Sequence, residues 1–405
     1  MKLKILTIFT ILLAVVIFLV ANYLGDIGSS SILSIDDNNN QKFISVGESN
    51  NNTNANQQVR QNKVDYKIQE AARNLEVPWS IAFTSENRVL IAERTGSIRI
   101  MADGKILEKP LIIFNDVVTG DEEGLMGLTV DPDYENNKYI YTSYAYVEGN
   151  IMYDKVLRLK DTGSSAVIDK ILLQKIPAAR FHAGSRLKFS PDGKLYITTG
   201  DALSKEQAQD LNSLGGKILR IESDGSIPQD NPFKNSLVYT YGHRNPQGID
   251  WNKNTGLMVS TEHGPSGTDG PGGGDEVNII KPGSNYGWPL VSHERTLDGA
   301  ESPKIVFTPA VAPASALMYS GKMFPQFKDN LFFGGLRGEG VYKVTFASDN
   351  PEKVASYEKM KEINLGRIRE IVESPSGEIW FSTSNTDGRG TVRQGDDKIY
   401  KITKK

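Results

Sequence analysis

Residues 185–201 have the sequence SRLKFSPDGKLYITTGD, in which two strand-like runs flank the turn Pro191-Asp192-Gly193. Pro, Asp and Gly are the residues that favour tight turns, and short apolar runs of this kind are typical of half-buried strands. The stretch therefore predicts an antiparallel hairpin, and the same phrase recurs along the chain.

Each copy of the phrase has an apolar entry strand, a polar turn and a second strand rich in aromatic and aliphatic residues. The six copies are VPWSIAFTSENRVLIAERTGSIRIM (77–101), GLMGLTVDPDYENNKYIYTSYAY (124–146), residues 185–201, PQGIDWNKNTGLMVSTEHG (246–264), SALMYSGKMFPQFKDNLFFGGL (315–336) and RIREIVESPSGEIWFSTSN (367–385). Six copies over residues 65–405 give roughly 57 residues each, close to the size of a propeller blade. A β-sandwich would explain the strands but not the repetition. The sequence predicts an all-β, six-bladed β-propeller in one domain, residues 65–405.

The N-terminal segment has a different character. Lys2 and Lys4 precede a nearly unbroken apolar run from Ile5 to Leu24. About 20 apolar residues are long enough to span a bilayer, and the positive end is expected inside the cell. We expect residues 1–27 to be a membrane anchor, with a cleaved signal peptide as the alternative. Either segment predicts export.

Residues 28–64 are rich in Asn and Ser, with runs such as DNNNQ and ESNNNTNANQQ. Such a composition buries too little apolar surface to fold, so a disordered linker is expected. The whole chain has no cysteine, which excludes disulfides, thiolate metal ligands and a C-x-x-C-H haem motif. The net charge is −3 with scattered basic residues, which argues against nucleic acid as a partner.

The segment from Tyr241 to Pro289 has little room for regular structure and contains many chemically capable side chains. Arg244 and Asn245 lie in YGHRNPQGIDW, His263 in EHGP, and Asp275-Glu276 follow three glycines. Long irregular loops usually build a site. Arg suits an anionic ligand, while carboxylates and the free carbonyls around Gly264-Pro265 suit calcium. A solvated acidic turn and a structural arginine are the competing interpretations.

Four histidines are available for proton transfer, namely His182, His243, His263 and His293. His182 enters the third repeat just before its first strand, and His243-Arg244 enter the fourth repeat at the equivalent place. Two repeats with capable residues at one blade position favour function there. For His182, packing between blades against a backbone carbonyl is an equally good interpretation.

Together these phrases resemble the glucose/sorbosone dehydrogenase family, the soluble quinoproteins that use pyrroloquinoline quinone (PQQ). The matching motifs include VPWSIAF, GLMGLTVDPDY, HAGSRLKFSPDGKLYITTGD, YGHRNPQGID, EHGP, GGDEVN, PGSNYGWP and GRIRE, in order from about residue 75 to 385. The resemblance covers essentially the whole body and implies a six-bladed propeller, in agreement with the repeat count.

The resemblance also implies roles for individual residues. His182 aligns with the catalytic base, Arg244 with the group that holds the quinone oxyanion together with calcium, and Asn245 with a neighbouring cofactor contact. Further cofactor contacts are implied at Glu122, Arg337, Arg367 and Arg369. Backbone ligands of the cofactor calcium are implied at Gly264 and Pro265, and a further calcium site at Glu276 and Tyr286. For Arg369, a salt bridge on the strand face is the stronger competing interpretation.

Three positions depart from the family pattern. Glu122-Glu123 replace a glutamine, which puts a carboxylate near an anionic cofactor. Phe181 replaces an aspartate beside the catalytic histidine, so the group that orients the imidazole is unidentified. Arg337 replaces a lysine, which keeps the charge and changes its geometry.

The expected function is PQQ- and calcium-dependent oxidation of an aldose at its anomeric carbon to a lactone, at the cell exterior. Because the chain has no haem motif, electrons would pass to an external acceptor. Two alternatives remain: a non-redox, calcium-holding propeller that binds glycan or protein, and a calcium-dependent lactonase-type hydrolase. Convergence of Arg244, Arg367, Arg369 and His182 at one mouth of the channel would favour the quinoprotein.

Overall fold

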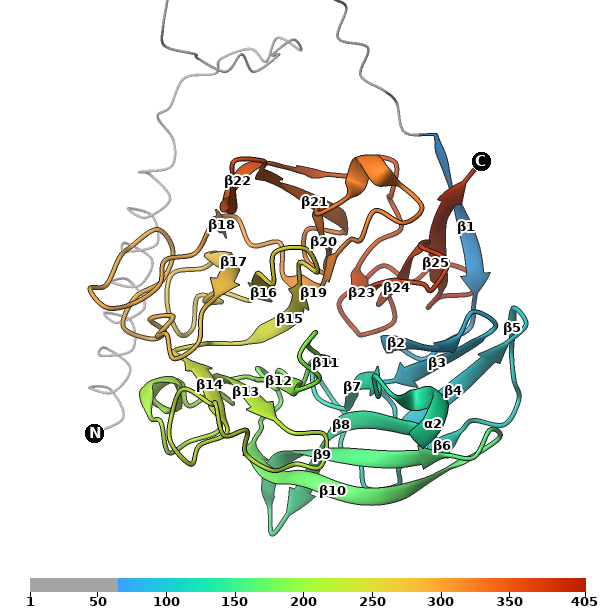
Figure 1. Cartoon of the computed structure of the whole chain (residues 1–405), viewed down its shortest axis with the longest axis horizontal. Coiled ribbons are helices and arrows are strands. Elements are labelled where there is room, and N and C mark those ends of the chain that lie inside the picture. Colours follow the sequence, from blue (N-terminus) through green and yellow to red (C-terminus); the bar gives the residue numbers. More distant parts are fainter. Residues whose placement is uncertain (1–64) are drawn as a thin grey trace, which may run out of the picture. The chain divides into compact units, whose positions relative to one another are not determined.

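The computed structural model describes residues 65–405, which form six antiparallel sheets around a central axis (Figure 1). The predicted six-bladed β-propeller is therefore confirmed. The predicted anchor (1–27) and linker (28–64) lie outside the described residues. Within residues 65–405, none of the helices has the length and apolarity needed to cross a membrane.

Each blade begins at the axis with an inner strand, and all six inner strands come from the predicted repeats. They are β2 (Pro78–Ser85), β7 (Leu125–Val130), β11 (Leu187–Phe189), β15 (Pro246–Trp251), β19 (Pro313–Met318) and β23 (Ile368–Glu373).

The remaining strands follow outward as hairpins. The second and third strands are β3 (Arg88–Glu93) and β4 (Ser97–Ala102), β8 (Tyr139–Glu148) and β9 (Ile151–Asp161), β12 (Leu195–Thr199) and β13 (Lys217–Ile221), β16 (Met258–Glu262) and β17 (Asp275–Ile280), β20 (Leu331–Gly335) and β21 (Gly340–Ala347), and β24 (Ile379–Thr383) and β25 (Ile399–Lys404). The outer strands are β5 (Lys105–Ile106) with β6 (Ile112–Ile113), β10 (Ala166–Pro177), β14 (Val238–Tyr241), β18 (Ile305–Phe307), β22 (Asn350–Lys359) and β1 (Tyr66–Ala72). Short helical turns are α2 (Tyr134–Asn137), η1 (Lys205–Gln209) and η2 (Pro325–Phe327).

The hairpin of residues 185–201 forms as expected. β11 pairs with β12, so that Phe189 faces Leu195 across the Pro-Asp-Gly turn. Gly193 has φ +79° there, a conformation that glycine adopts without strain. The turn residues therefore fix the register of this blade.

The sixth blade is closed by strands from both ends of the propeller, in the sheet order β1-β25-β24-β23. Tyr66 pairs with Lys404 and Ile68 with Ile402. Figure 1 shows β1 beside β25 at the edge of the ring. This closure ties the first strand to the last, so the ring has no gap between its first and sixth blades.

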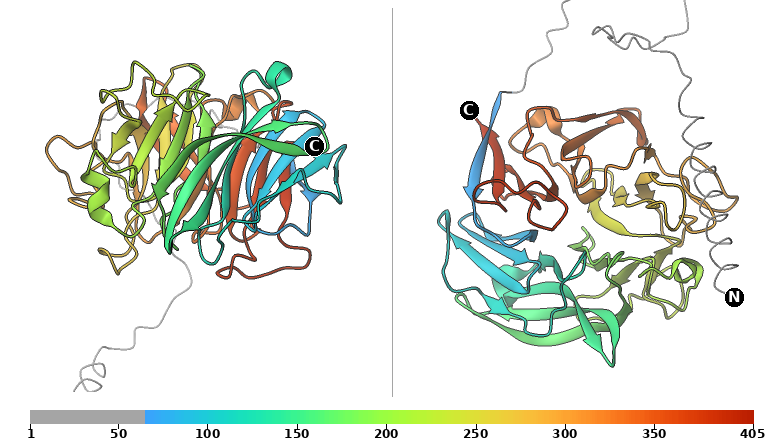
Figure 2. Two further views of the ribbon diagram at one scale, coloured as in Figure 1. Left: turned by 90° about the horizontal axis from the view of Figure 1, so that it is seen from below. Right: turned by 180° about the vertical axis from the view of Figure 1, so that it is seen from behind.

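The hydrophobic core is a ring of layers between adjacent blades and leaves the axis polar. Clusters lie between blades one and two, two and three, three and four, four and five, five and six, and six and one. In the side view of Figure 2, the blades form a thick disc with loops at both ends. Because each blade packs on two neighbours, the inner strands are held rigidly enough to position the loops that follow them.

Candidate active site

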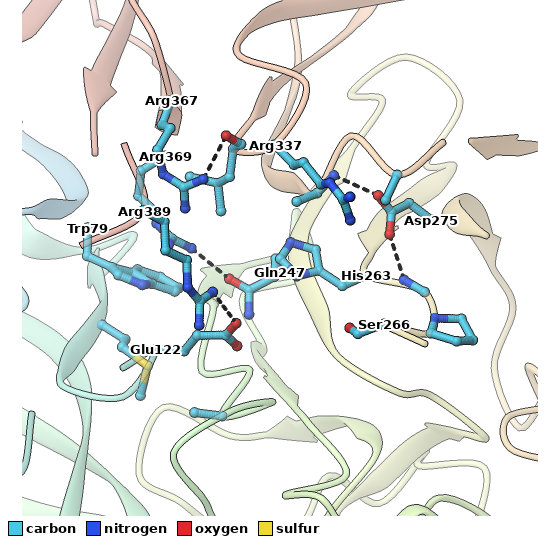
Figure 3. A pocket seen from close by; sticks show the side chains of 17 residues that line it. Trp79, Glu122, Gln247, His263, Ser266, Asp275, Arg337, Arg367, Arg369 and Arg389 are labelled. Carbon is cyan, nitrogen blue, oxygen red and sulfur yellow. Dashed lines mark hydrogen bonds and ion pairs between the residues drawn. The ribbon is translucent and has the colours of Figure 1, made fainter. Parts of the chain in front are cut away.

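A cavity of about 360 Å³ opens where the loops of several blades converge (Figure 3). We call it the main cavity, and its wall includes Trp79, Gln247, His263, Arg369 and Arg389. Arg337, Arg367 and Glu122 also line it, so four arginines face one small volume. Such a concentration of guanidinium groups suits a ligand with several anionic oxygens.

Several donors in and beneath the main cavity have no hydrogen-bond partner. Arg369 is 5% exposed and donates to Gln247 Oε1 at 3.2 Å, while its Nε has no partner. The ring nitrogen His263 Nε2 and the amide Asn245 Nδ2 are also buried and unpaired. Burial lowers the pKa of Arg369 to about 9 and that of His263 to about 4. Unpaired buried polar atoms are costly, and an anionic, acceptor-rich ligand in the cavity would satisfy Arg369 Nε.

The two arginines of GRIRE, Arg367 and Arg369, have different partners. Arg367 is saturated by the protein, because it binds the carboxylate of Asp387 at 2.7 Å and the carbonyl of Leu336 at 2.9 Å. Arg369 has no carboxylate partner within residues 65–405 and lies 5.7 Å from the centre of the Trp79 ring. The salt bridge considered for Arg369 is therefore made by Arg367, and Arg369 faces the cavity.

Arg337 is exposed at the rim of the main cavity, and Asn245 lies outside its lining. The Asn245 side chain is fully buried, and its oxygen accepts from Gly184 N and Gln247 Nε2, each at 3.1 Å. In this structure Asn245 therefore supports Gln247 and the loop after His182 from below.

An ion pair on the axis lies below the main cavity. Arg186 Nη1 binds Glu370 Oε2 at 2.5 Å, and its guanidinium lies 4.1 Å from the centre of the Trp79 ring. Both side chains are less than 8% exposed. Arg186 and Glu370 line a separate cavity at the other end of the channel and are absent from the wall of the main cavity. The pair therefore separates the two ends of the channel.

A second hollow of about 520 Å³ adjoins the main cavity, and we call it the side chamber. His182 lines it and is 7% exposed. Its Nδ1 lies 2.7 Å from Asp201 Oδ1, and Asp201 Oδ2 accepts from Trp288 Nε1 at 2.8 Å. A carboxylate at Nδ1 fixes the imidazole with its proton on that nitrogen and leaves Nε2 free to accept a proton. The sequence left the group that orients the imidazole unidentified, because Phe181 replaces an aspartate beside His182. Asp201 is that group.

The backbone also fixes His182. The residue has φ +59°, an uncommon conformation outside glycine. Gly200 packs so closely that an added Cβ would lie 1.8 Å from the carbonyl oxygen of His182. Glu122 Oε2 accepts the His182 backbone N–H at 3.1 Å. The loop after β12 thus holds the imidazole by side-chain and main-chain contacts together.

Arg244 lies between the side chamber and the loop after β16. Its Nε donates to Asp269 Oδ2 at 2.7 Å, and its Nη atoms donate to the His263 carbonyl and to Ser266 Oγ. Arg244 and Asp269 both line the side chamber. Arg244 is therefore pre-positioned beside His182, with its charge partly balanced by Asp269.

The loop at Gly264 and Pro265 contributes backbone to the main cavity. Asp275 beside it accepts from Gly264 N at 2.8 Å and from the N–H groups of Val311 and Ala312 at 2.7 and 2.6 Å. Its oxygens are thus already occupied. Any cation at this place would depend on backbone carbonyls rather than on Asp275.

Glu276 and Glu262 are cross-strand neighbours at the buried ends of β17 and β16. Burial, with the charge of Glu262 added, raises the pKa of Glu276 to about 8. Both carboxylates and Tyr286 line a hollow of about 10 Å³, and the Tyr286 hydroxyl donates to the Ile279 carbonyl at 2.7 Å. Among residues 65–405 there is no group of three or more His, Cys, Asp or Glu side chains placed to hold a metal. Ligation at Glu276 would therefore need backbone oxygens as well.

The sequence compares clearly with known proteins. The model of the family Glucose / Sorbosone dehydrogenase matches residues 75–393. The chain belongs to the glucose/sorbosone dehydrogenase family. This membership places it among oxidoreductases that act on sugars.

Similar members of the family support this assignment. Aldose sugar dehydrogenase YliI of Escherichia coli (strain K12) is 31% identical over 338 residues, covering 78% of this chain and 89% of that protein. Quinoprotein glucose dehydrogenase B of Acinetobacter calcoaceticus is 34% identical over 430 residues, covering 80% and 86% respectively. The PQQ-bound aldose sugar dehydrogenase of Streptomyces coelicolor superposes with a TM-score of 0.73 at 29% identity, covering 84% of this chain and 98% of that one.

An anionic cofactor of the kind bound by such glucose/sorbosone dehydrogenase family members fits the main cavity. The unpaired Nε of Arg369 and the exposed guanidinium of Arg337 would meet its oxygens, with the unpaired His263 Nε2 beside them. The Gly264-Pro265 backbone at the cavity wall, and the Glu276 hollow beside it, fit calcium by donor chemistry.

Other residues of the site were not predicted from the family pattern. Asp201 ends the motif HAGSRLKFSPDGKLYITTGD and Gln247 lies inside RNPQG, whereas Asp269 carries no signal beyond its place in a loop. Arg389 lies in the loop after β24, just beyond the sixth repeat and outside every family motif, and it lines both the main cavity and the side chamber.

Proposed function

We propose that this protein oxidises aldoses at the anomeric carbon to lactones, with PQQ and calcium as cofactors. One observation carries the proposal. The imidazole of His182, oriented by Asp201 at 2.7 Å, lies in a chamber that adjoins a cavity lined by four arginines, of which Arg369 is buried with an unpaired Nε. A proton acceptor beside a site for an anionic oxidant is what this oxidation requires, because the anomeric hydroxyl loses a proton while the anomeric carbon loses a hydride.

Each residue of the site has a separate role in the proposed reaction. His182 Nε2 accepts the proton of the anomeric hydroxyl, and the Asp201 carboxylate stabilises the imidazolium that forms. Arg244, held by Asp269 and the His263 carbonyl, places positive charge next to the reacting centre. When bound, PQQ supplies the hydride-accepting quinone, and calcium would be held by the Gly264 and Pro265 carbonyls. Arg369, Arg337 and His263 hold and orient the cofactor in the main cavity.

The same arrangement argues against the two alternatives. A glycan-binding propeller or a lactonase has no need for a cluster of arginines, one of them buried with an unpaired donor, above an Arg186–Glu370 ion pair. His182 and Arg244 line the side chamber, Arg367 and Arg369 line the main cavity, and the two hollows share three residues. The convergence that favours a quinoprotein is thus present at one end of the channel.

The decisive experiment is to purify the full chain in mild detergent, add calcium and PQQ, and follow reduction of an artificial dye across a panel of aldoses. We expect turnover that needs both additions and is lost in His182→Ala. Stoichiometric PQQ binding without turnover on any aldose would refute the substrate class. An absence of PQQ binding would refute the quinoprotein proposal.

Our proposal for the cell location rests on the N-terminal sequence alone. We propose that residues 1–27 direct export and tether the propeller to the membrane, so that an external acceptor takes the electrons. Fractionation of cells that express the full chain tests this. Recovery of the intact protein in the cytosolic fraction would refute it.

A further inference from the structure

The main cavity and the side chamber are separated by a small set of side chains. Glu122, Ser266 and Arg389 are the residues that line both hollows. Glu122 Oε1 accepts from Arg389 Nη1 at 2.9 Å across 267 residues of sequence. Figure 3 shows this ion pair in front of Trp79 and Arg369. The Glu122–Arg389 pair therefore forms part of the wall between the two hollows.

The backbone of Arg389 is held in place, whereas its guanidinium is partly exposed. Its N–H donates to Asp387 Oδ1 at 3.0 Å, and the other oxygen of Asp387 is held by Arg367. The next residue, Gly390, packs so tightly that an added Cβ would lie 2.7 Å from Arg367 Cδ. The side chain of Arg389 is nevertheless 46% exposed, and Glu122 is its only side-chain hydrogen-bond partner within the described residues.

Glu122 is fixed on its other side. Its Oε2 accepts the backbone N–H of His182, which ties the carboxylate to the loop that carries the candidate base. Although burial alone would raise the pKa of Glu122, its contacts with the Arg389 guanidinium and the His182 N–H hold that pKa below its usual value, so the group is ionised. Of the two partners, Arg389 is the one that can turn away.

The charges around the main cavity show what the pair does. Asp387 balances Arg367, and three backbone N–H groups occupy Asp275. Glu122 is the remaining carboxylate on the cavity wall, and it lies against Arg389. A carboxylate or quinone oxygen of a bound anion would contact the same guanidinium. Glu122 thus holds Arg389 in the way that an anionic ligand would.

We propose that Arg389 is a further cofactor-binding residue and that Glu122 is its internal competitor. This inference rests on the proposed function, because the ligand is the anionic quinone. When the cofactor binds, Arg389 either leaves Glu122 for the cofactor or contacts both. The carboxylate of Glu122 therefore weakens the net affinity for the cofactor. Glu122 lies close to an anionic ligand without expelling it, because Arg389 and the His182 N–H balance its charge.

The test measures binding rather than turnover. PQQ is titrated into the calcium-loaded full chain in detergent, and quenching of tryptophan fluorescence gives Kd for wild type, E122Q, R389Q and the double variant. We expect Kd to fall about three- to tenfold in E122Q and to rise about tenfold or more in R389Q. The effects of E122Q and R389Q on Kd should not be additive in the double variant, because the competition needs both groups.

The matched control is R180Q. Arg180 makes a similar exposed ion pair with Asp121 at 2.6 Å, beside Phe181, and lines neither hollow. Its Kd should equal that of wild type. R389K, which keeps the charge, should lie between wild type and R389Q, and melting temperatures confirm that each variant is folded.

The outcomes separate the two proposals. Wild-type protein that binds no PQQ refutes the proposed function and this inference with it. Wild-type protein that binds PQQ, together with an R389Q variant of unchanged Kd, refutes only the role of Arg389. Weaker binding in E122Q refutes the competition, since it would mean that Glu122 supports the site.

Discussion

Replacement of Asp201 by asparagine tests the candidate base through the group that orients it. Asp201 accepts from His182 at 2.7 Å, from the Leu203 N–H at 2.9 Å and from Trp288 at 2.8 Å. An asparagine can place its oxygen toward only some of these donors. If its NH2 group faces His182 Nδ1, the proton moves to Nε2, and the nitrogen that should accept the substrate proton becomes a donor.

The size of the effect follows from that change. General base catalysis is worth on the order of 10²- to 10⁴-fold, so kcat of D201N should fall by that factor. Loss of a charged hydrogen bond in a buried site costs about 1.5–3 kcal/mol of folding stability, so D201N should fold with a lowered Tm. PQQ binding should change little, because Asp201 lines the side chamber and not the main cavity.

The assay is rapid-mixing of calcium- and PQQ-loaded protein with an aldose, following reduction of the cofactor in a single turnover. The control is D210N, which changes an exposed carboxylate on the same loop that lines neither hollow. A D201N rate within threefold of wild type, with intact folding, would contradict the assignment of His182 as a base oriented by Asp201.

Four further predictions concern other parts of the molecule. Gly200→Ala should destabilise the fold by about 3 kcal/mol or more or abolish turnover, because its Cβ would lie 1.8 Å from the His182 carbonyl oxygen. Thermal unfolding and activity measure this effect, and wild-type values for both would refute the close approach. Arg369→Gln should raise Kd for PQQ at least tenfold with a small change in Tm, because its unpaired Nε faces the cavity; unchanged Kd would be inconsistent with that role. Glu276→Gln should remove part of the rise in Tm that calcium gives to wild type, and an equal rise in both proteins would exclude ligation there. Burial raises the pKa of Asp154 from 3.8 to about 8, so the folded chain holds this proton more tightly than the unfolded chain. The free energy of unfolding therefore falls as pH rises through that range. Asp154→Asn should lessen the fall between pH 5 and 8 by at least about 1.4 kcal/mol, as urea titrations at both pH values would show.

The repeats predicted the six inner strands, because each copy begins with a buried apolar run that ends at a polar turn. The closure by β1 was beyond the sequence. Its segment YKIQEAA alternates like any edge strand, and nothing local indicates that its partner is β25. Pairings between the two ends of a chain are set by the whole ring, so they have no local signal.

The site shows the same division between local and long-range information. Phe181, next to His182 in sequence, left the group that orients the imidazole unidentified, and Asp201 reaches it from 19 residues away because Gly200 lets two loops touch. The carboxylate of Glu122 seemed unfavourable beside an anionic ligand until the sixth blade supplied Arg389. Motifs identify residues that contact a ligand, whereas residues that balance one another across blades emerge only from the fold.

The pairing of β1 with β25 has a consequence for biosynthesis. The strand Tyr66–Ala72 is made before the other five blades, whereas its partner Ile399–Lys404 is made after them. β1 must therefore wait with its edge unpaired through the synthesis of those five blades before the sixth blade can be completed. A chain that lacks Ile399–Lys404 would leave the ring unsealed, with an open sheet edge at each side of the break.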